Sequence, residues 1–374
     1  MSSPQTIVSL LHEMEQTVLD REHEMELIEA DFRKVSDAYL DPVYRSRHKT
    51  ARKRSAERQH KLAEQLDARG RQIDREQPPY VSLGRESFSR NHPVPDTLVV
   101  GRLHLQARTR EFDLPAELDF PFTRPVSVNT GQDLALLQGL MLRLLSALPV
   151  GSCQFTIYDP ETRGEAVRPF LPLQRFSEVF PDRRVLTDAK ELQNALQRLQ
   201  SEMDCRVQTV FTDDYPNWAD YHRYSRSEKV LNYLVLILLI PPEELGDEAV
   251  TAVNYLAKNG ERCGILTIFS SQEVDPEAYL GREQARRRAQ VLREHAAPIS
   301  SLWEEIGGPL LRLQPQVSPY PLPRREELEI LVRDYAHQIG LPLLACRILC
   351  PQIPHSTMPD RQCFGYTLFT FLLL

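Results

Sequence analysis

Apolar residues between positions 7 and 39 recur at alternating spacings of four and three, the beat of a heptad seam. They are Ile7, Leu11, Met14, Val18, Met25, Ile28, Phe32, Val35 and Tyr39. Only Arg21 interrupts the series, and no proline or glycine falls between residues 5 and 40. The pattern predicts one long amphipathic helix that ends at Asp41 and Pro42.

A second proline-free stretch follows at residues 43–76, with sparse apolar positions at Leu62, Leu66 and Ile73. Residues 1–40 hold nine acidic and three basic side chains, whereas residues 41–76 hold six acidic and eleven basic ones. The two arms therefore carry net charges of −6 and +5. Oppositely charged arms with a short connection favour an antiparallel helical hairpin, a coiled coil over residues 1–76.

The basic side chains of the second arm have two interpretations. In the first, they pair with the glutamates of the first arm. In the second, they form a patch that contacts the phosphates of a nucleic acid, although few aromatic residues accompany them for base stacking. The residues concerned are Arg45, Arg47, Lys49, Arg52, Lys53, Arg54, Arg58 and Lys61.

Beyond a proline-containing linker at residues 77–97, short β-rich runs alternate with amphipathic helical stretches. Strands are expected at 97–105, 126–129, 152–158, 232–240 and 264–270. Helices are expected at 132–148, 188–205 and 246–258. This alternation predicts a three-layer α/β domain at residues 98–308, with helices covering both faces of a mostly parallel sheet.

The turn before the first of these helices is where an NTPase places its phosphate loop. Here the turn consists of Asn129, Thr130, Gly131, Gln132 and Asp133. A working loop needs a lysine for the β and γ phosphates and a Ser or Thr hydroxyl for Mg²⁺. Gln132 and Asp133 occupy those two positions, and we expect Asp133 to cap the helix instead.

Four short stretches resemble the FtsK/SpoIIIE family of hexameric DNA-translocating ATPases, specifically its degenerate motor copies. They are 100–103 (VGRL), 132–149 (QDLALLQGLMLRLLSALP), 155–160 (FTIYDP) and 261–265 (ERCGI). The resemblance extends from residue 99 to about residue 276. It implies a RecA-like P-loop NTPase-type fold in a module that works beside an intact motor.

The acidic end of the family's Walker B strand is also missing. The strand expected at 232–240 ends in Ile240, Pro241 and Pro242, and the acidic pair Glu243 and Glu244 comes later. Without the lysine, the hydroxyl and the strand-end carboxylates, nothing neutralises a transferring phosphoryl group. We therefore expect neither hydrolysis nor a cofactor, with ATP and Mg²⁺ bound only if the degenerate loop keeps some affinity.

Three further segments have both a functional and a structural interpretation. Asp159 ends a strand, where open α/β sheets hold ligands, but it also suits a turn before Pro160, which we favour. The aromatic segment 215–224 resembles a surface for single-stranded nucleic acid, but helix periodicity favours packing. The arginine run at 282–293 could face DNA or a neighbouring subunit, but a solvated helix face is favoured.

Composition and charge narrow the possible functions and cellular locations of the protein. A net charge of −7 argues against a chain that coats nucleic acid over its whole surface. Six dispersed cysteines without a signal peptide are typical of a reducing cytoplasm. The longest apolar runs, 234–240 and 367–374, are too short to span a bilayer. We expect no metal site, although Cys346, Cys350, His355 and Cys363 lie close in sequence.

The last part of the chain, residues 309–374, begins with a proline-rich linker at 309–323 and a short helix at 326–338. The apolar end at 363–374 is expected to be a partner surface or the mark of a truncated longer protein.

The sequence as a whole predicts a non-catalytic accessory segment of a DNA-translocating or DNA-processing machine, docking a protein partner or an active motor subunit. Direct DNA binding by the basic arm, a structural coiled-coil adaptor and homo-oligomerisation remain alternatives.

Overall fold

The computed structural model describes residues 6–34, 41–107, 110–225, 230–272, 283–306 and 316–340. Its contacts divide the chain into two units, Met1–Ile339 and Gly340–Leu374. The following description concerns the first unit. The cysteine and histidine group at 346–363 and the apolar end at 363–374 lie outside the described residues.

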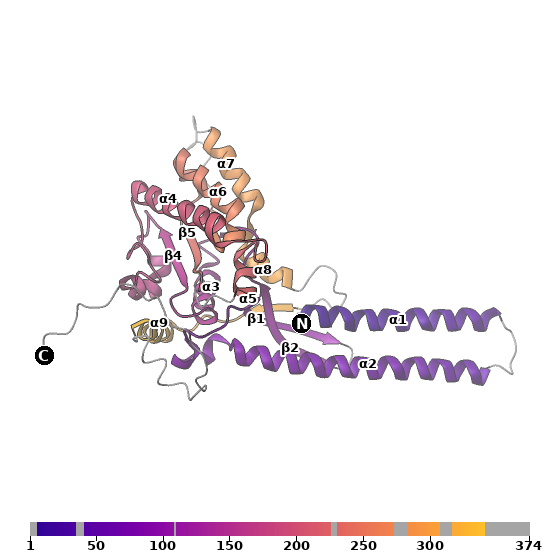
Figure 1. Ribbon diagram of the computed structural model, residues 1–374. Coiled ribbons are helices and arrows are strands. Elements are labelled where there is room, and N and C mark those ends of the chain that lie inside the picture. The colour runs from indigo at the N-terminus through magenta and orange to yellow at the C-terminus, as the bar shows by residue number, and fades with distance from the viewer. Residues whose placement is uncertain are drawn as a thin grey trace. The chain divides into compact units, whose positions relative to one another are not determined.

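The predicted hairpin is confirmed: α1 (Ile7–Lys34) and α2 (Asp41–Glu76) lie side by side and antiparallel (Figure 1). Buried seam residues from the prediction are Ile7, Leu11, Met14 and Ile28 on α1, and Leu62, Leu66 and Ile73 on α2. The side chains of Phe32, Val35 and Tyr39 lie outside the description. Asp41 and Pro42 begin α2 rather than ending α1, since the first turn of a helix tolerates proline.

Oppositely charged side chains connect the two arms. Arg58 on α2 lies 3.3 Å from the Glu13 carboxylate, and Arg54 lies 3.7 Å from Glu24. These contacts agree with the interpretation in which the arms pair with each other. Such exposed pairs stabilise the hairpin by only about 0.2–1 kcal/mol each, so the buried seam supplies most of its stability.

The main sheet has five strands in the order β4-β5-β6-β3-β7, and all the paired neighbours are parallel. The strands are β3 (Val126–Val128), β4 (Cys153–Tyr158), β5 (Tyr233–Leu238), β6 (Ile265–Ser270) and β7 (Ala297–Pro298). The helices are α3 (Leu134–Ala147), α4 (Ala189–Cys205), α5 (Trp218–Tyr224), α6 (Asp247–Cys263), α7 (Glu283–His295), α8 (Ile299–Ile306) and α9 (Arg325–Gly340). Short 3-10 helices span Tyr80–Ser82, Arg85–Ser87, Glu165–Arg175 and Pro242–Glu244, and a π-helical turn spans Arg206–Val210.

Strand β5 shows why the domain has three layers. All six of its residues are buried, as expected of a central parallel strand covered on both faces. Val235 and Ile237 point into the core that contains α3, whereas Leu234, Leu236 and Leu238 point into the core that contains α4, α6 and α7. The predicted three-layer, RecA-like α/β fold is therefore confirmed.

A second sheet, antiparallel and three-stranded, has the order β2-β1-β8. It comprises β1 (Thr97–Ala107), β2 (Arg110–Asp119) and β8 (Gln316–Pro319). The strand expected at 97–105 thus exists but is not part of the parallel sheet. Only two residues separate β1 from β2, too few for the crossover that parallel neighbours require. Strand β8 lies within the stretch expected to be a linker.

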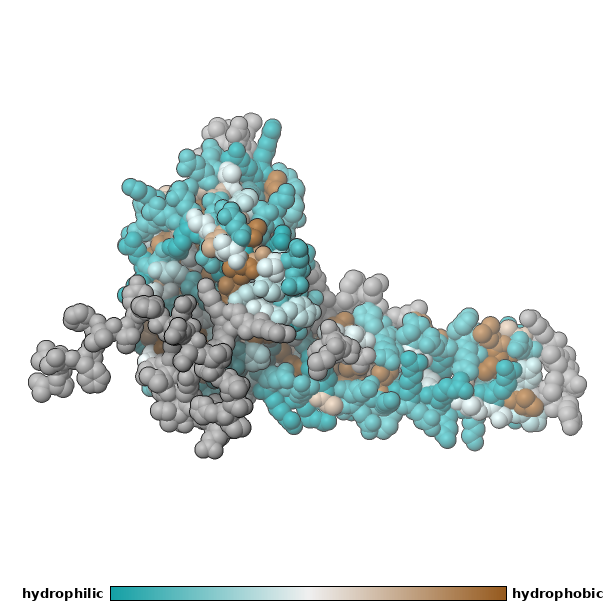
Figure 2. Space-filling model, viewed as in Figure 1, coloured by the Kyte–Doolittle hydropathy of each residue, from teal (hydrophilic) through white to brown (hydrophobic). Residues whose placement is uncertain are grey.

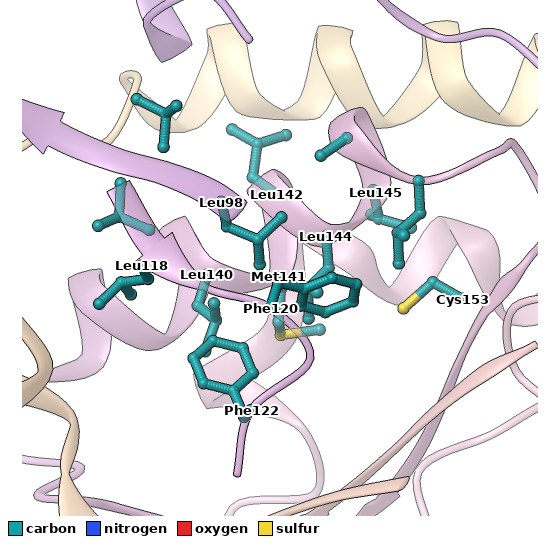
Figure 3. Close-up of a cluster of buried hydrophobic side chains, with 14 of the residues drawn as sticks. Leu98, Leu118, Phe120, Phe122, Leu140, Met141, Leu142, Leu144, Leu145 and Cys153 are labelled. Carbon is teal, nitrogen blue, oxygen red and sulfur yellow. The ribbon is translucent and has the colours of Figure 1, made fainter. Parts of the chain in front are cut away.

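Helix α3 lies between the two sheets and is buried on almost every side (Figure 3). Leu140, Met141 and Leu144 pack near Leu98 and Phe120 of the antiparallel side. A helix that is apolar all round belongs in a core rather than at a surface. The loop preceding α3 is therefore attached to a helix that is buried along most of its length.

Residues 77–97 pack against the domain at several points. The Gln77 side chain donates to the Thr97 carbonyl (2.7 Å) and accepts from the Val99 N–H (3.0 Å). The Tyr80 hydroxyl donates to the Gly139 carbonyl of α3 (2.7 Å). The buried Arg143 guanidinium lies 4.9 Å from the centre of the Tyr80 ring. These contacts connect the end of α2 to β1 and α3.

Burial of tyrosines predicts that the fold loses stability in alkali. Burial raises the pKa of Tyr80 to about 12, against 10.0 for an exposed tyrosine, and also raises the pKa of Tyr233 and Tyr335. The unfolded chain loses the Tyr80 proton near pH 10, whereas the folded chain keeps it until about pH 12. Stability is therefore complete below pH 10 and falls as pH rises towards 12, by about 2–3 kcal/mol from Tyr80 alone.

Urea titrations between pH 8 and pH 12 measure this loss, with tyrosinate absorbance recorded in parallel. Tyr80→Phe should make the fall between pH 10 and pH 12 shallower. A free energy of unfolding that stays constant to pH 12 would contradict the prediction.

Candidate nucleotide site

The carboxyl ends of parallel strands form the edge at which α/β sheets hold ligands. Four loops leave the sheet there: 129–133 after β3, 159–164 after β4, 239–243 after β5 and 271–272 after β6. The Ser271 N–H donates to the Val128 carbonyl (2.9 Å), which joins the β6 loop to the end of β3. The structure thus brings the predicted phosphate-loop residues to the edge where a nucleotide would bind.

The loop after β3 is closed by its own hydrogen bonds. The Gln132 and Asp133 N–H groups both donate to the Asn129 carbonyl, at 3.0 and 2.7 Å. The Gly131 N–H donates to Asn129 Oδ1 at 3.0 Å, and the Asn129 N–H donates to Asp133 Oδ2 at 3.3 Å. A phosphate loop depends on backbone N–H groups that point at the ligand. Four such groups are engaged inside this turn.

Asp133 does not play the capping role expected of it. It occupies the N-cap position of α3, but its side chain accepts no hydrogen bond from the first turn of the helix. Its backbone, at φ −102° and ψ 13°, lies outside the extended region that lets a cap side chain reach those N–H groups. The carboxylate turns back to the Asn129 N–H instead. Gln132 is exposed.

Gly131 lacks the geometry that makes glycine necessary in a phosphate loop. It is absent from the positive-φ glycines of the described chain, Gly151, Gly164 and Gly264. A Cβ at Gly131 would meet only Asn129 Oδ1, at 3.4 Å. No close backbone approach is prepared at this position.

The first acidic residue after β5 in the sequence, Glu243, is paired with an arginine. Arg293 of α7 binds both carboxylate oxygens of Glu243, at 2.5 and 2.8 Å. The same guanidinium donates to the Ser271 carbonyl (3.1 Å) and to the Gln272 carbonyl (2.9 Å). Arg293 therefore joins the loops after β5 and β6, and Glu243 is held as an ion-pair partner rather than presented to a metal ion. In the sequence, Arg293 was part of the arginine run expected to be a solvated helix face, and that expectation is wrong at this position.

Asp159 organises the turn that follows β4. Its carboxylate is buried and accepts hydrogen bonds from the Thr162 N–H (2.8 Å), the Thr162 hydroxyl (2.5 Å) and the Gly164 N–H (2.6 Å). Gly164 adopts a left-handed conformation with φ +91°. The geometry is that of the turn residue we favoured from the sequence.

The same edge is unfavourable for phosphate on electrostatic grounds. Partial desolvation, followed by the neighbouring Glu161 and Glu243 carboxylates, raises the pKa of Glu244. Partial burial is the larger cause, and the two neighbouring carboxylates add to it. A nucleotide bound here would meet carboxylates and a closed loop, without the lysine that normally offsets its charge.

The predicted nucleic-acid residues lie elsewhere, along the outer surface of α2, and the structure does not bring them to the sheet edge. All eight of the predicted basic side chains, from Arg45 to Lys61, are exposed. Arg54 and Arg58 pair with α1, and Lys53 lies 3.8 Å from Glu57.

The other segments singled out in the sequence have structural roles where they are described. In α5, Trp218 and Tyr221 are buried, and Trp218 Nε1 donates to the Leu231 carbonyl (3.0 Å). Arg288 of α7 donates to the Thr251 hydroxyl (2.6 Å). Within the described ranges, no group of three or more His, Cys, Asp or Glu side chains is placed to hold a metal ion. A search of the same ranges finds no helix long and apolar enough to cross a bilayer.

Comparison with known proteins finds similar solved structures at low sequence identity. No protein-family model matches the sequence, and no curated protein does. The cytoplasmic domain of EssC matches with a TM-score of 0.43 and 13% identity, over 71% of this chain and 53% of that one. EssC (ATPases 2 and 3) from Geobacillus thermodenitrificans gives 0.44 and 15%, over 67% and 51%. The cytoplasmic domain of the Thermomonospora curvata type VII secretion ATPase EccC gives 0.44 and 16%, over 70% and 34%. In each case this chain spans about half or less of the solved structure.

Proposed function

We propose that this chain is a non-catalytic, NTPase-like accessory module of a larger cytoplasmic machine, whose motor activity belongs to another chain. Its work is assembly and partner docking, and the hairpin is its docking element. One observation carries the proposal: the turn at Asn129–Asp133 uses its backbone N–H groups on its own acceptors. A nucleotide phosphate would have to break those hydrogen bonds to bind.

The side chains around that turn support the same conclusion. Phosphoryl transfer relies on positioning and on neutralising charge, through a lysine, a metal ion and acidic metal ligands. Here Gln132 is neutral, Asp133 adds negative charge, and Glu243 is occupied by Arg293. Restoring a single one of these groups would leave the others unsuited to catalysis.

The expected result for the purified full chain is no Mg²⁺-dependent ATP turnover above the buffer blank and no saturable binding of ATP by calorimetry. Installing the missing groups by combining Gln132→Lys with Asp133→Ser should not restore binding. Asn129 still engages the N–H groups of the loop in that variant. Restored millimolar or tighter binding would show that side chains alone had been limiting.

ATP turnover by the unmodified chain that Asp133→Ala abolishes would overturn the proposal. Glu161→Gln, an exposed position in the neighbouring turn after β4, serves as the matched control, since it removes one carboxylate without touching the loop. It should behave like the unmodified chain in both assays.

The DNA-related role implied by the resemblance to FtsK/SpoIIIE remains a prediction. The surface that would carry it is the basic arm, where eight exposed lysine and arginine side chains lie from Arg45 to Lys61. The charges of the hairpin as a whole favour a different partner.

A further inference from the structure

We propose that the hairpin docks with a second copy of this chain, the acidic outer face of α1 in one copy meeting the basic outer face of α2 in the next. The inference rests on the proposed docking role and names its partner. Within the helix bounds, α1 holds eight acidic and three basic side chains, and α2 holds six acidic and eleven basic. The hairpin therefore presents one negative and one positive long side.

Only part of this charge is used within one copy. Arg54 and Arg58 reach across to glutamates of α1. Within the described chain, several other basic side chains of α2 are exposed and make no ion pair; they are Arg47, Lys49, Arg52 and Lys61. On α1 the same holds for Glu26 and Asp31. Charges without partners in one copy are available to another.

The register of the hairpin places these unused charges at matching levels. His48 Nδ1 lies 3.0 Å from the sulfur of Met25, so positions 25 and 48 are opposite each other in the antiparallel pair. One residue nearer the tip on each arm, Glu26 of α1 lies at the level of Arg47 of α2. Two hairpins set parallel and side by side, without axial displacement, would bring Glu26 of one to the level of Arg47 of the next. The complementarity is thus one of position as well as of net charge.

Apolar side chains in the same half of the hairpin add to this face. Leu27 on α1 and Val43 on α2 are 55% and 53% exposed. Figure 2 shows hydrophobic groups towards the far end of an otherwise mostly hydrophilic hairpin. An apolar contact flanked by opposite charges is the usual composition of a helix-to-helix interface.

Nucleic acid fits the hairpin less well than a second copy does. Packed helices lie about 8–10 Å apart, close to the screening length of about 8 Å at physiological salt. A polyanion on α2 would therefore feel the acidic arm beside it, on a chain whose net charge is already −7. A second copy offers a complement to both faces. Such contacts between unlike faces are heterologous and either close into a ring or extend.

A charge-swap experiment on the full chain tests the inference. The basic-face variant combines Arg47→Glu with Arg52→Glu, and the acidic-face variant combines Glu26→Lys with Asp31→Lys. The control combines Arg286→Glu with Arg287→Glu, two exposed positions of α7 with the same change in charge. Sedimentation velocity at about 0.05 M and about 0.5 M salt measures self-association, and circular dichroism verifies that each variant is folded.

The unmodified chain and the control should associate at low salt and dissociate at high salt. Each face variant alone should weaken association at least about tenfold in apparent dissociation constant, since attraction becomes repulsion at two contacts. An equimolar mixture of the two face variants should associate again, because each supplies the face that the other lacks. A structural defect in either variant would not be repaired by mixing.

An unmodified chain that stays monomeric at both salt concentrations would overturn the inference, as would face variants that associate like the control. The face would be assigned to nucleic acid instead by three results together. The basic-face variant would lose binding of a DNA duplex, the acidic-face variant would gain it, and the two variants would not associate on mixing. Any of these results, obtained while ATP turnover remains absent, removes the inference and leaves the proposed lack of catalysis intact.

Discussion

Gly101→Ala is expected to lower the free energy of unfolding by about 3 kcal/mol, a large effect for a single methyl group. A Cβ at this position would lie 2.2 Å from the Ser318 carbonyl oxygen and 2.9 Å from the Pro319 Cα. Both atoms belong to the backbone of β8, which pairs with β1 at this point. Since backbone cannot rotate away as a side chain can, β8 must separate from β1. The structure thus gives a physical reason for the glycine in the VGRL stretch.

Urea denaturation measures the loss, and hydrogen exchange locates it. The Tyr320 N–H, which donates to the Val100 carbonyl at 3.0 Å, should lose protection first. Gly131→Ala is the matched control: its Cβ has only one neighbour, at 3.4 Å, and the change should stay within about 0.5 kcal/mol. Equal denaturation midpoints for the two variants would refute the predicted clash.

Arg293→Ala should have the second largest effect, a loss of about 2–3 kcal/mol in the free energy of unfolding. It removes the two contacts to Glu243 and the hydrogen bonds to the Ser271 and Gln272 carbonyls. The Glu243 side chain is only 13% exposed, so it is left as a poorly hydrated charge. Leaving one partner of a shielded ion pair alone costs more than the pair itself contributes.

Thermal and urea unfolding of three variants of α7 separate the causes. Arg293→Lys keeps the charge but cannot bind both carboxylate oxygens, so it should fall between the unmodified chain and Arg293→Ala. Arg286→Ala, at an exposed site on the same helix, should change stability by no more than about 0.5 kcal/mol. If Arg293→Ala matched Arg286→Ala, the ion pair would have no structural role.

The parallel sheet was predictable because the apolar composition of its strands indicates that they are buried. The run at 233–238 is entirely apolar, and such runs bounded by polar turns are typical of strands covered on both faces. The hairpin was equally predictable from the sequence, since its buried residues follow a helical period and the two arms differ in charge. In both cases local pattern and tertiary environment agree.

The antiparallel sheet was not predicted because two of its strands, β2 and β8, lack a clear strand pattern in the sequence. Strand β2 contains Pro115 and charged residues at both ends, which weakens any signal for a strand. It forms as the edge strand of its sheet, where proline is tolerated, and it packs against the hairpin. Strand β8 is four residues long and pairs with a strand more than two hundred positions earlier. No local pattern encodes such a partner.

At the candidate site, the sequence showed which groups were missing but not what the remaining groups do. The residue types at 132 and 133 indicated lost chemistry directly. The direction of the Asp133 carboxylate depends on the backbone angles of one turn, and the grip of Arg293 on Glu243 joins positions fifty residues apart. Both depend on tertiary geometry that composition and spacing do not contain.

The contacts at Gln77 make the hairpin a rigid extension of the α/β domain rather than a flexible attachment. At 1.5 Å per residue, the 36 residues of α2 extend about 54 Å. Its end is fastened to β1 by both polar atoms of one amide, and Arg102 of β1 grips Asp74 of α2 at 2.8 Å. A force applied at the far end of the hairpin is therefore transmitted as torque to β1 and to α3, which packs against it, because these contacts fix the end of α2. A partner that holds the tip would thereby fix the orientation of the whole α/β domain.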